Sequence, residues 1–222
     1  MSEALRVETK GLLFDMDGVL VSSIGSVRRC WQRWAAMYGV PNADTYEVPH
    51  GMRAIEIVKQ LRPDIDPQEG LRVIECMEIE DTEDLKVLPG VKALLESLPP
   101  ERWAIVTSAT RRLMLGRLEA AGLPVPERIV SADDVERGKP DPEPYRRGAV
   151  LLDCRPEECI VVEDAPSGVG AGKAAGGRVL GVIGTHTIEE LHEADWVVPS
   201  LEGVVAKSNN GGLELTFSPE PR

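Results

Sequence analysis

The 222-residue sequence lacks several features that would assign it to a class at once. Its cysteines form no CxxC pair, so we expect free and mostly buried thiols instead of a zinc site or a redox pair. No apolar run approaches the roughly 20 residues that a membrane span needs, and the opening segment MSEALRVETK has no apolar signal-peptide region. We therefore expect a cytoplasmic protein. The cysteines are Cys30, Cys76, Cys154 and Cys159.

Basic residues are outnumbered by acidic ones. Lys and Arg total 25 against 37 Asp and Glu, which gives a net charge of −12. This excess of negative charge repels nucleic acids and anionic membranes, so we expect neither as a partner. If the substrate is anionic as well, a bound metal cation is the simplest way to offset the repulsion.

The order of the apolar segments predicts the fold class. A hydrophobic content of 42% over 222 residues suits one domain, or one domain with a large insertion. An apolar strand at 12–15 is followed by three segments of helical periodicity, and strands then alternate with helices from about residue 88 onward. Strands that are apolar throughout and separated by helices indicate a parallel sheet covered on both faces. The three helical segments span 24–38, 52–61 and 67–80.

These patterns predict an α/β fold with a Rossmann-like parallel sheet and an inserted helical-bundle cap. The core would comprise residues 1–21 and 90–222, and the cap residues 22–89. Toward the end of the chain we expect a short helix at 187–194 and an edge strand at 196–198. The turn SNNGG precedes an expected C-terminal strand.

Polar side chains follow the predicted strands at the edge where open α/β sheets bind ligands. Taken singly, such residues are usually helix caps or solvated loop charges. Taken together, the carboxylates among them would repel one another unless a cation lies between them, and their hard oxygens suit Mg²⁺. The residues are Asp15 and Asp17 after the first strand, Thr107, Ser108 and Ala109 after the next, Lys139 in the loop GKPDP, and Glu163 and Asp164 after a later strand.

This set of groups is suited to phosphoryl transfer. A metal-bound carboxylate can act as a nucleophile and form an aspartyl-phosphate, and a second carboxylate two residues on can protonate the leaving oxygen and later activate water. Lys139 can balance the charge of the nucleophile and of the phosphate. Hydroxyls and backbone N–H groups at Thr107, Ser108 and Ala109 can hold phosphate oxygens.

Four segments resemble the four motifs of the haloacid dehalogenase superfamily. DMDGVL, VTSAT, GKPDP and VVEDAPSG occur in the family's order, with a cap between the first two. An aspartate at position 17 resembles the phosphohydrolase and phosphomutase branch of the family rather than the dehalogenases. The resemblance implies the strand order 5-4-1-2-3, with Asp15 and Asp164 on neighbouring strands.

The resemblance also implies a role for each catalytic position. Asp15 would be the nucleophile and Asp17 the general acid and base. Lys139 matches the lysine of the third motif. The hydroxyl of the second motif is either Thr107 or Ser108, because family members place it differently relative to the strand.

A Mg²⁺ site is implied by the same motifs. Its ligands would be Asp15, the backbone carbonyl of Asp17, and Asp164, with Glu163 as a direct or outer ligand. Mg²⁺ is therefore the expected cofactor.

The cap resembles the small α-helical type of β-phosphoglucomutase and sugar phosphatases. Its segment HGMR resembles the substrate loop of glycerol-3-phosphatases and 2-deoxyglucose-6-phosphate phosphatases. We therefore expect substrate contacts from His50 and Arg53, in addition to Ser108, Ala109 and Lys139. The alternative is that His50 only caps a helix and Arg53 is a surface charge.

The preferred hypothesis is a Mg²⁺-dependent phosphatase of a small phosphorylated sugar or polyol, acting as a monomer. One alternative is a hexose-phosphate mutase, which would have to shield its aspartyl-phosphate from water. The other is a receiver-type phospho-acceptor domain, but such a domain has no reason to carry a substrate cap.

Overall fold

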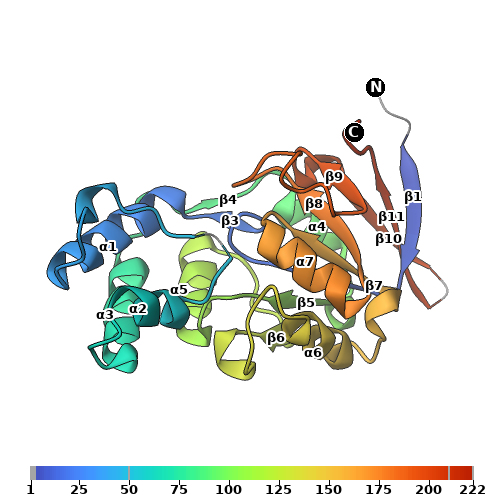
Figure 1. Ribbon diagram of the computed structural model, residues 1–222. Helices are drawn as coiled ribbons and strands as arrows, with labels where there is room; N and C mark the ends of the chain where they lie inside the picture. Colours follow the sequence, from blue (N-terminus) through green and yellow to red (C-terminus); the bar gives the residue numbers. More distant parts are fainter. Residues whose placement is uncertain (1–3, 50, 210, 222) are drawn as a thin grey trace.

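The computed structural model describes residues 4–49, 51–209 and 211–221, and Figure 1 shows an α/β core with a group of helices at one end. A parallel sheet with the strand order β6-β5-β2-β7-β8-β9 forms the centre of the core. This order confirms the predicted 5-4-1-2-3 arrangement, with β9 added at the edge beside β8. The strands are β2 (Gly11–Phe14), β5 (Trp103–Val106), β6 (Ile129–Val130), β7 (Cys159–Glu163), β8 (Arg178–Val182) and β9 (Trp196–Val198).

Helices cover both faces of this sheet, as predicted. Along β2, Leu12 and Phe14 point into one apolar cluster and Leu13 points into another, as the period of two along a strand requires. Every residue of β2, β5 and β7 is buried. The first cluster packs against α4 (Val91–Ser97) and α5 (Arg111–Ala121), and the second against α6 (Glu143–Leu151) and α7 (Pro166–Ala175).

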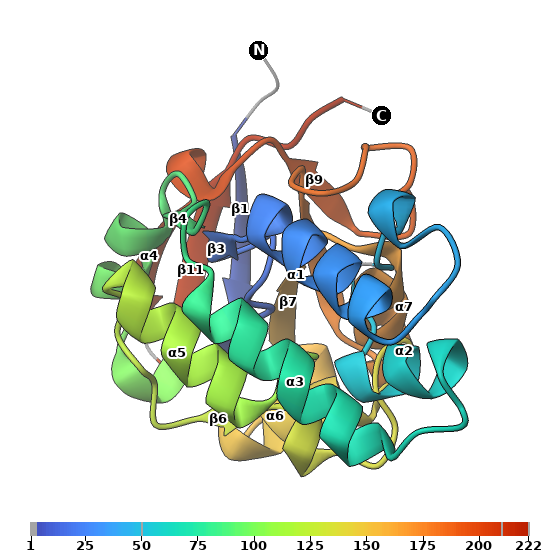
Figure 2. The same ribbon diagram turned by 90° about the vertical axis from the view of Figure 1, so that its left-hand side faces the viewer.

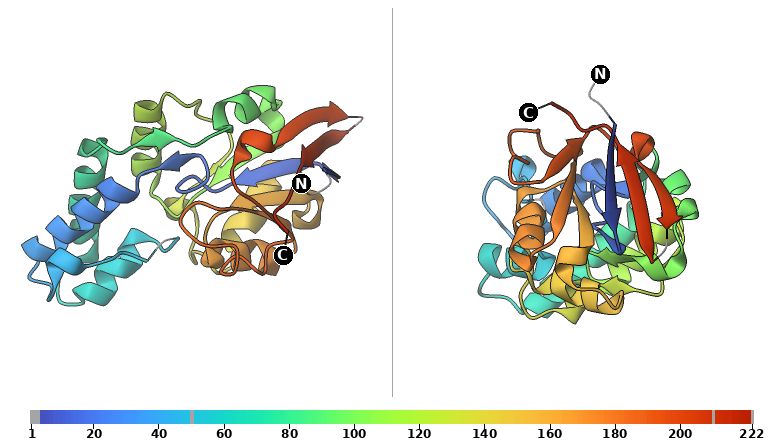
Figure 3. Two further views of the ribbon diagram at one scale, coloured as in Figure 1. Left: turned by 90° about the horizontal axis from the view of Figure 1, so that it is seen from above. Right: turned by 90° about the vertical axis from the view of Figure 1, so that its right-hand side faces the viewer.

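A second, antiparallel sheet joins the two ends of the described chain. It has the order β1-β11-β10, and the right view of Figure 3 shows the blue strand β1 beside the red strands near the C-terminus. The predicted C-terminal strand is thus confirmed, but β1 was missed because its segment LRVET is short and mostly exposed. The strands are β1 (Leu5–Thr9), β10 (Val205–Asn209) and β11 (Gly212–Phe217).

The predicted helix at 187–194 is wrong. The segment forms turns, in which the N–H of Leu191 donates to the carbonyl of Thr187 at 3.1 Å. Leu191 and Ala194 are buried, so the turns already seat the apolar side chains of the segment. An eight-residue helix has little stability of its own in water, because its nucleus is costly to form.

The inserted helices pack around an apolar cluster of their own, and Figure 2 shows them from the end of the molecule. The chain leaves the core at β3 (Val21–Ser22) and returns at β4 (Lys86–Val87), and these two strands pair antiparallel. Trp34 belongs to this cluster and is fully buried. We call α1 (Ile24–Met37), α2 (Ala54–Leu61) and α3 (Pro67–Glu80) the cap helices.

The cysteines are free thiols, as expected, but only Cys30 and Cys159 are buried, while Cys76 and Cys154 are partly exposed. Within the described ranges, no helix combines the length and the apolar character that a membrane crossing requires.

Replacing Trp34 tests the packing of the cap helices. Its indole N–H donates to the carbonyl of Gly70 on α3 at 2.9 Å, so Trp34→Phe removes this bond and part of the ring volume. We expect the free energy of unfolding to fall by about 1–3 kcal/mol in urea denaturation. The control Arg33→Ala, at an exposed position of the same helix, should change it by less than about 0.5 kcal/mol. If the two substitutions lowered the free energy of unfolding equally, Trp34 would not have the proposed role in packing the cap helices.

Candidate active site

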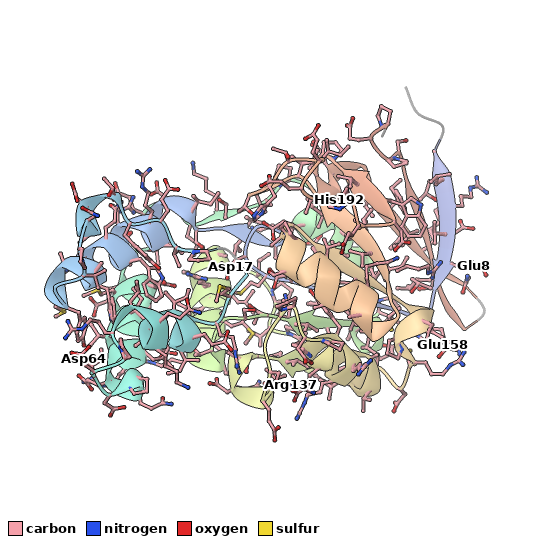
Figure 4. All side chains as sticks on the ribbon, viewed as in Figure 1. Glu8, Asp17, Asp64, Arg137, Glu158 and His192 are labelled. Atoms are coloured by element: carbon pink, nitrogen blue, oxygen red, sulfur yellow. The ribbon has the colours of Figure 1, made fainter. Side chains whose placement is uncertain are left out.

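The first acidic pair lies where the core sheet meets the cap helices, and Figure 4 shows Asp17 at this junction. Asp15 directly follows β2, and its N–H donates to the carbonyl of Val162 at 3.0 Å. Gly18 has a φ of +84°, and a Cβ there would lie 1.8 Å from Oδ2 of Asp164. Only glycine can occupy position 18, because the chain turns away from the sheet there while the carboxylate of Asp164 fills the space beside it.

Lys139 ties the ends of three strands together. Its Nζ donates to Asp15 Oδ1 at 2.5 Å, to Glu163 Oε1 at 2.7 Å and to the carbonyl of Val106 at 3.1 Å. Burial alone would lower the pKa of Lys139, but the charges of Asp15 and Glu163 outweigh it and raise the pKa. The lysine therefore stays charged, and all three of its donors are engaged by the protein.

Both carboxylate oxygens of Glu163 accept hydrogen bonds from the protein. Besides Lys139, its Oε1 accepts the hydroxyl of Tyr145 at 2.7 Å, and its Oε2 accepts the N–H groups of Asp164 and Ala165 at 2.9 and 3.1 Å. These bonds occupy the lone pairs of the carboxylate. They favour an outer position for Glu163, in which it fixes Lys139 and the end of β7. Tyr145 was missed because no local pattern in PEPYRR marks it.

Three buried carboxylates form a group that could hold a metal ion. Asp15, Glu163 and Asp164 each place one oxygen within 4.8 Å of the others. Oδ2 of Asp164 accepts the hydroxyl of Thr185. Among the described residues, no hydrogen bond reaches Oδ2 of Asp15 or Oδ1 of Asp164. Buried carboxylate oxygens gathered this closely, with Oδ1 of Asp164 free of donors from the described residues, fit a hard divalent cation such as Mg²⁺.

The electrostatics of this group also favour a cation. Burial raises the pKa of Asp15 well above its ordinary value, although Lys139 opposes the shift. Burial and the neighbouring charge of Glu163 raise the pKa of Asp164 to about 7. One lysine among three carboxylates leaves negative charge uncompensated, and a divalent cation would remove that cost.

Asp17 stands apart from the other carboxylates. Its Oδ1 accepts the hydroxyl of Ser23 at 3.1 Å, and its Oδ2 accepts Nη1 of Arg117 at 2.6 Å. The other end of that guanidinium, Nη2, donates to Glu78 Oε2 at 2.5 Å. Burial raises the pKa of Glu78 to about 7, although Arg117 opposes the shift.

These contacts of Asp17 were not predicted. The sequence carries one signal for them, because Arg117 lies four residues after Leu113 and therefore on the same face of α5. Both side chains are buried. A charged residue on the buried face of a helix requires a partner, but the sequence does not name Glu78 as that partner.

The residues of the second motif point toward different partners. Oγ1 of Thr107 accepts the N–H of Ala109 at 3.1 Å. The hydroxyl of Ser108 donates to the carbonyl of Gly51 in the cap at 2.7 Å. Ser108 thus links the core to the cap loop, while Thr107 organises its own turn.

A cavity of about 110 Å³ lies between the cap helices and the ends of the core strands. The core contributes polar groups and the cap contributes mostly apolar ones, so a small molecule with one charged end fits this division. The lining includes Asp15, Asp17, Thr107, Ser108, Ala109, Asp164 and Arg117 from the core, and Val27, Trp31, Met52, Ile57 and Glu78 from the cap.

Residues 12–182 match the family model described as Haloacid dehalogenase-like hydrolase. The chain belongs to this family. The match spans all four motifs that the sequence analysis singled out, so the resemblance stated there is confirmed.

This haloacid dehalogenase-like hydrolase has relatives of similar length. It is 41% identical over 210 residues to Hexitol phosphatase A of Escherichia coli (strain K12), covering 92% of this chain and 97% of the relative. It is 30% identical over 217 residues to Glycerol-1-phosphate phosphohydrolase 2 of Saccharomyces cerevisiae, covering 91% of this chain and 87% of the relative. A solved hydrolase from Pseudomonas syringae superposes with a TM-score of 0.76 at 25% identity, over 87% of this chain and 94% of that one.

In this hydrolase, Arg53, one of the two cap residues that were predicted to contact the substrate, is not among the described residues that line the cavity. Arg53 donates to the carbonyls of Val135 and Glu136 at 3.2 and 3.1 Å, and it also pairs with Glu56. Its guanidinium thus joins the start of α2 to the loop that precedes Lys139. His50 lies outside the described residues. A substrate contact by either residue stays a prediction.

The raised pKa values predict how stability depends on pH. The folded pKa of Asp164 lies at about 7, above its ordinary value of 3.8, so folding takes up a proton between these limits. In EDTA, the free energy of unfolding should therefore fall as pH rises from about 4 to 7, by roughly 1 kcal/mol per pH unit for each such proton. Urea denaturation at several pH values measures this slope.

The variant Asp164→Asn isolates one contribution to that slope. It removes a titrating group, so the decline toward pH 7 should be shallower than in the wild type. Carboxylates with a lowered pKa, such as Glu158 at about 2, change stability only at lower pH. Identical slopes for the variant and the wild type would contradict the shifted pKa of Asp164.

Proposed function

We propose that this protein is a Mg²⁺-dependent phosphatase that hydrolyses a small phosphorylated sugar or polyol through an aspartyl-phosphate on Asp15. The observation that supports the proposal most directly is the environment of the Asp15 carboxylate. The residue lines the cavity, Lys139 holds one carboxylate oxygen, and no described residue donates to the other. The names of the relatives, a hexitol phosphatase and a glycerol-1-phosphate phosphohydrolase, support the substrate class.

The residues divide the reaction into two steps. In the first, Oδ2 of Asp15 bonds to phosphorus while the ester P–O bond breaks, and Asp17, which must enter this step protonated, gives its proton to the departing alcohol oxygen. In the second, Asp17 takes a proton from water as the water oxygen bonds to phosphorus and the bond between phosphorus and Asp15 breaks. Inorganic phosphate and the free Asp15 carboxylate result. The charge of Lys139 favours the ionised form of Asp15 before the attack and after hydrolysis.

A bound Mg²⁺ would neutralise phosphate charge near Asp15. The residues that would hold it are Asp15 and Asp164, together with the backbone carbonyl of Asp17. Glu163, with its oxygens already engaged, would support them from the outer position described above.

The remaining assignments follow from the same arrangement. Residues 22–89 would act as a cap over the cavity, with the phosphate oxygens held near Thr107, Ser108 and Ala109. Lys139 would contact the phosphate only by giving up one of its three present acceptors. We also propose a cytoplasmic monomer whose partner is a small metabolite and not a nucleic acid or a membrane.

Hydrolysis is favoured over the mutase alternative. A mutase must bind a second phosphate group, and Arg53 is the cap cation for which a substrate contact was expected. Its guanidinium instead contacts Glu56 and the backbone of the core loop. The receiver alternative is incompatible with membership of a hydrolase family.

Replacing the nucleophile tests the proposal directly. Asp15→Asn keeps the size of the side chain but not its charge, so release of inorganic phosphate from sorbitol 6-phosphate or glycerol 1-phosphate should fall at least about 10³-fold. EDTA should abolish the wild-type activity and Mg²⁺ should restore it. The control Asp64→Asn, at an exposed site of the cap, should retain full activity. Turnover by Asp15→Asn at the wild-type rate would rule out the proposal.

A further inference from the structure

A chain of buried charged groups crosses the boundary between the cap and the core and ends on Asp17. Glu78 lies on α3 of the cap and Arg117 on α5 of the core, and Figure 2 shows these helices side by side. The side chains of Glu78 and Arg117 are only 6% and 7% exposed. Nη2 of Arg117 contacts Glu78 at 2.5 Å, and Nη1 contacts Asp17 at 2.6 Å.

A role in stability alone does not account for this arrangement. Burying an arginine is costly, and one carboxylate already compensates its charge. A second buried contact joins the same region, from Thr110, which directly precedes α5, to Glu75 on α3. That contact joins the cap to the core without reaching Asp17. Nη1 of Arg117 instead donates to Asp17, the residue that gives a proton to the leaving group in the proposed reaction.

We propose that Arg117 is a positioning residue for Asp17, and that Glu78 holds Arg117 in place from the cap. This inference rests on the proposed function. The rigid, forked guanidinium suits the task, because its two ends can bind two carboxylates in a set direction. With Ser23 on Oδ1 and Arg117 on Oδ2, the carboxylate of Asp17 has a fixed orientation at the cavity wall.

The position of Asp17 matters most where the leaving group needs a proton. The alkoxide of a sugar or polyol leaves poorly unless its oxygen is protonated as the P–O bond breaks, and a positioned acid contributes about 10²–10⁴-fold to such a step. The p-nitrophenolate ion is stabilised by its ring and leaves without that proton. Loss of the positioning contact should therefore slow alkyl esters far more than the aryl ester.

The experiment compares kcat/KM for sorbitol 6-phosphate, glycerol 1-phosphate and p-nitrophenyl phosphate. This constant covers the steps up to the departure of the alcohol, so the later hydrolysis of the aspartyl-phosphate does not affect it. Arg117→Met should lower kcat/KM about 10²-fold for the alkyl esters and less than about 3-fold for the aryl ester, since no acid is needed there. Arg117→Lys, which keeps the charge but not the fork, should show an intermediate selective loss.

A matched pair of variants tests the contribution of the cap. Glu78→Leu and Glu75→Leu each remove a buried carboxylate of α3 that contacts an arginine of α5, Arg117 for Glu78 and Arg112 for Glu75. Only the first should lower the ratio of alkyl to aryl kcat/KM, by about 10-fold, because only Glu78 holds the arginine that contacts Asp17. A partly unfolded variant loses both activities in proportion, so this ratio does not depend on the folded fraction.

The outcomes separate the inference from the function on which it rests. If Arg117→Met or Glu78→Leu lowers kcat/KM equally for alkyl and aryl esters, Arg117 has only a structural role and the inference is overturned. The wild-type activity would still uphold the proposed function in that case. A wild type that hydrolyses none of the three esters in the presence of Mg²⁺ would overturn the proposed function and the inference with it.

Discussion

The site depends on one buried cation. Lys139 lies between the end of β2 and the end of β7 and donates to Asp15, Glu163 and the carbonyl of Val106. These contacts place carboxylates from neighbouring strands at the switch point of the sheet, where α/β proteins bind ligands. Lys139 opposes the effect of burial on the pKa of Asp15, so without the lysine Asp15 would be less able to act as the proposed nucleophile.

The two aspartates of the first motif contact different cations, Asp15 contacting Lys139 and Asp17 contacting Arg117. Gly18 turns the chain, and Asp17 leaves the group around Lys139 to contact Ser23 and Arg117. Two like charges can therefore stand two residues apart because each has its own compensating cation. The separation also gives the carboxylates distinct surroundings, which a nucleophile and a proton donor require.

The sequence predicted the parts of this arrangement that follow local rules. Apolar strands ending in acids located Asp15, Glu163 and Asp164, and the order of strands and helices predicted the sheet. The contacts of Arg117 with Asp17 and Glu78 span 100 and 39 residues, so no local pattern contains them. The turns at 187–194 were mistaken for a helix because tertiary packing of Leu191 and Ala194, and not periodicity, determines their form.

The most direct test of the account is a search for the covalent intermediate. The protein would be mixed with Mg²⁺ and sorbitol 6-phosphate or glycerol 1-phosphate, quenched in acid within milliseconds, and its peptides analysed by mass spectrometry. If Asp15 is the nucleophile, the peptide that contains it carries one phosphoryl group, and the same peptide of the Asp15→Asn variant carries none. Phosphate release by the wild type with no phosphoryl group on Asp15 at any quench time, or with the group on another residue, would contradict it.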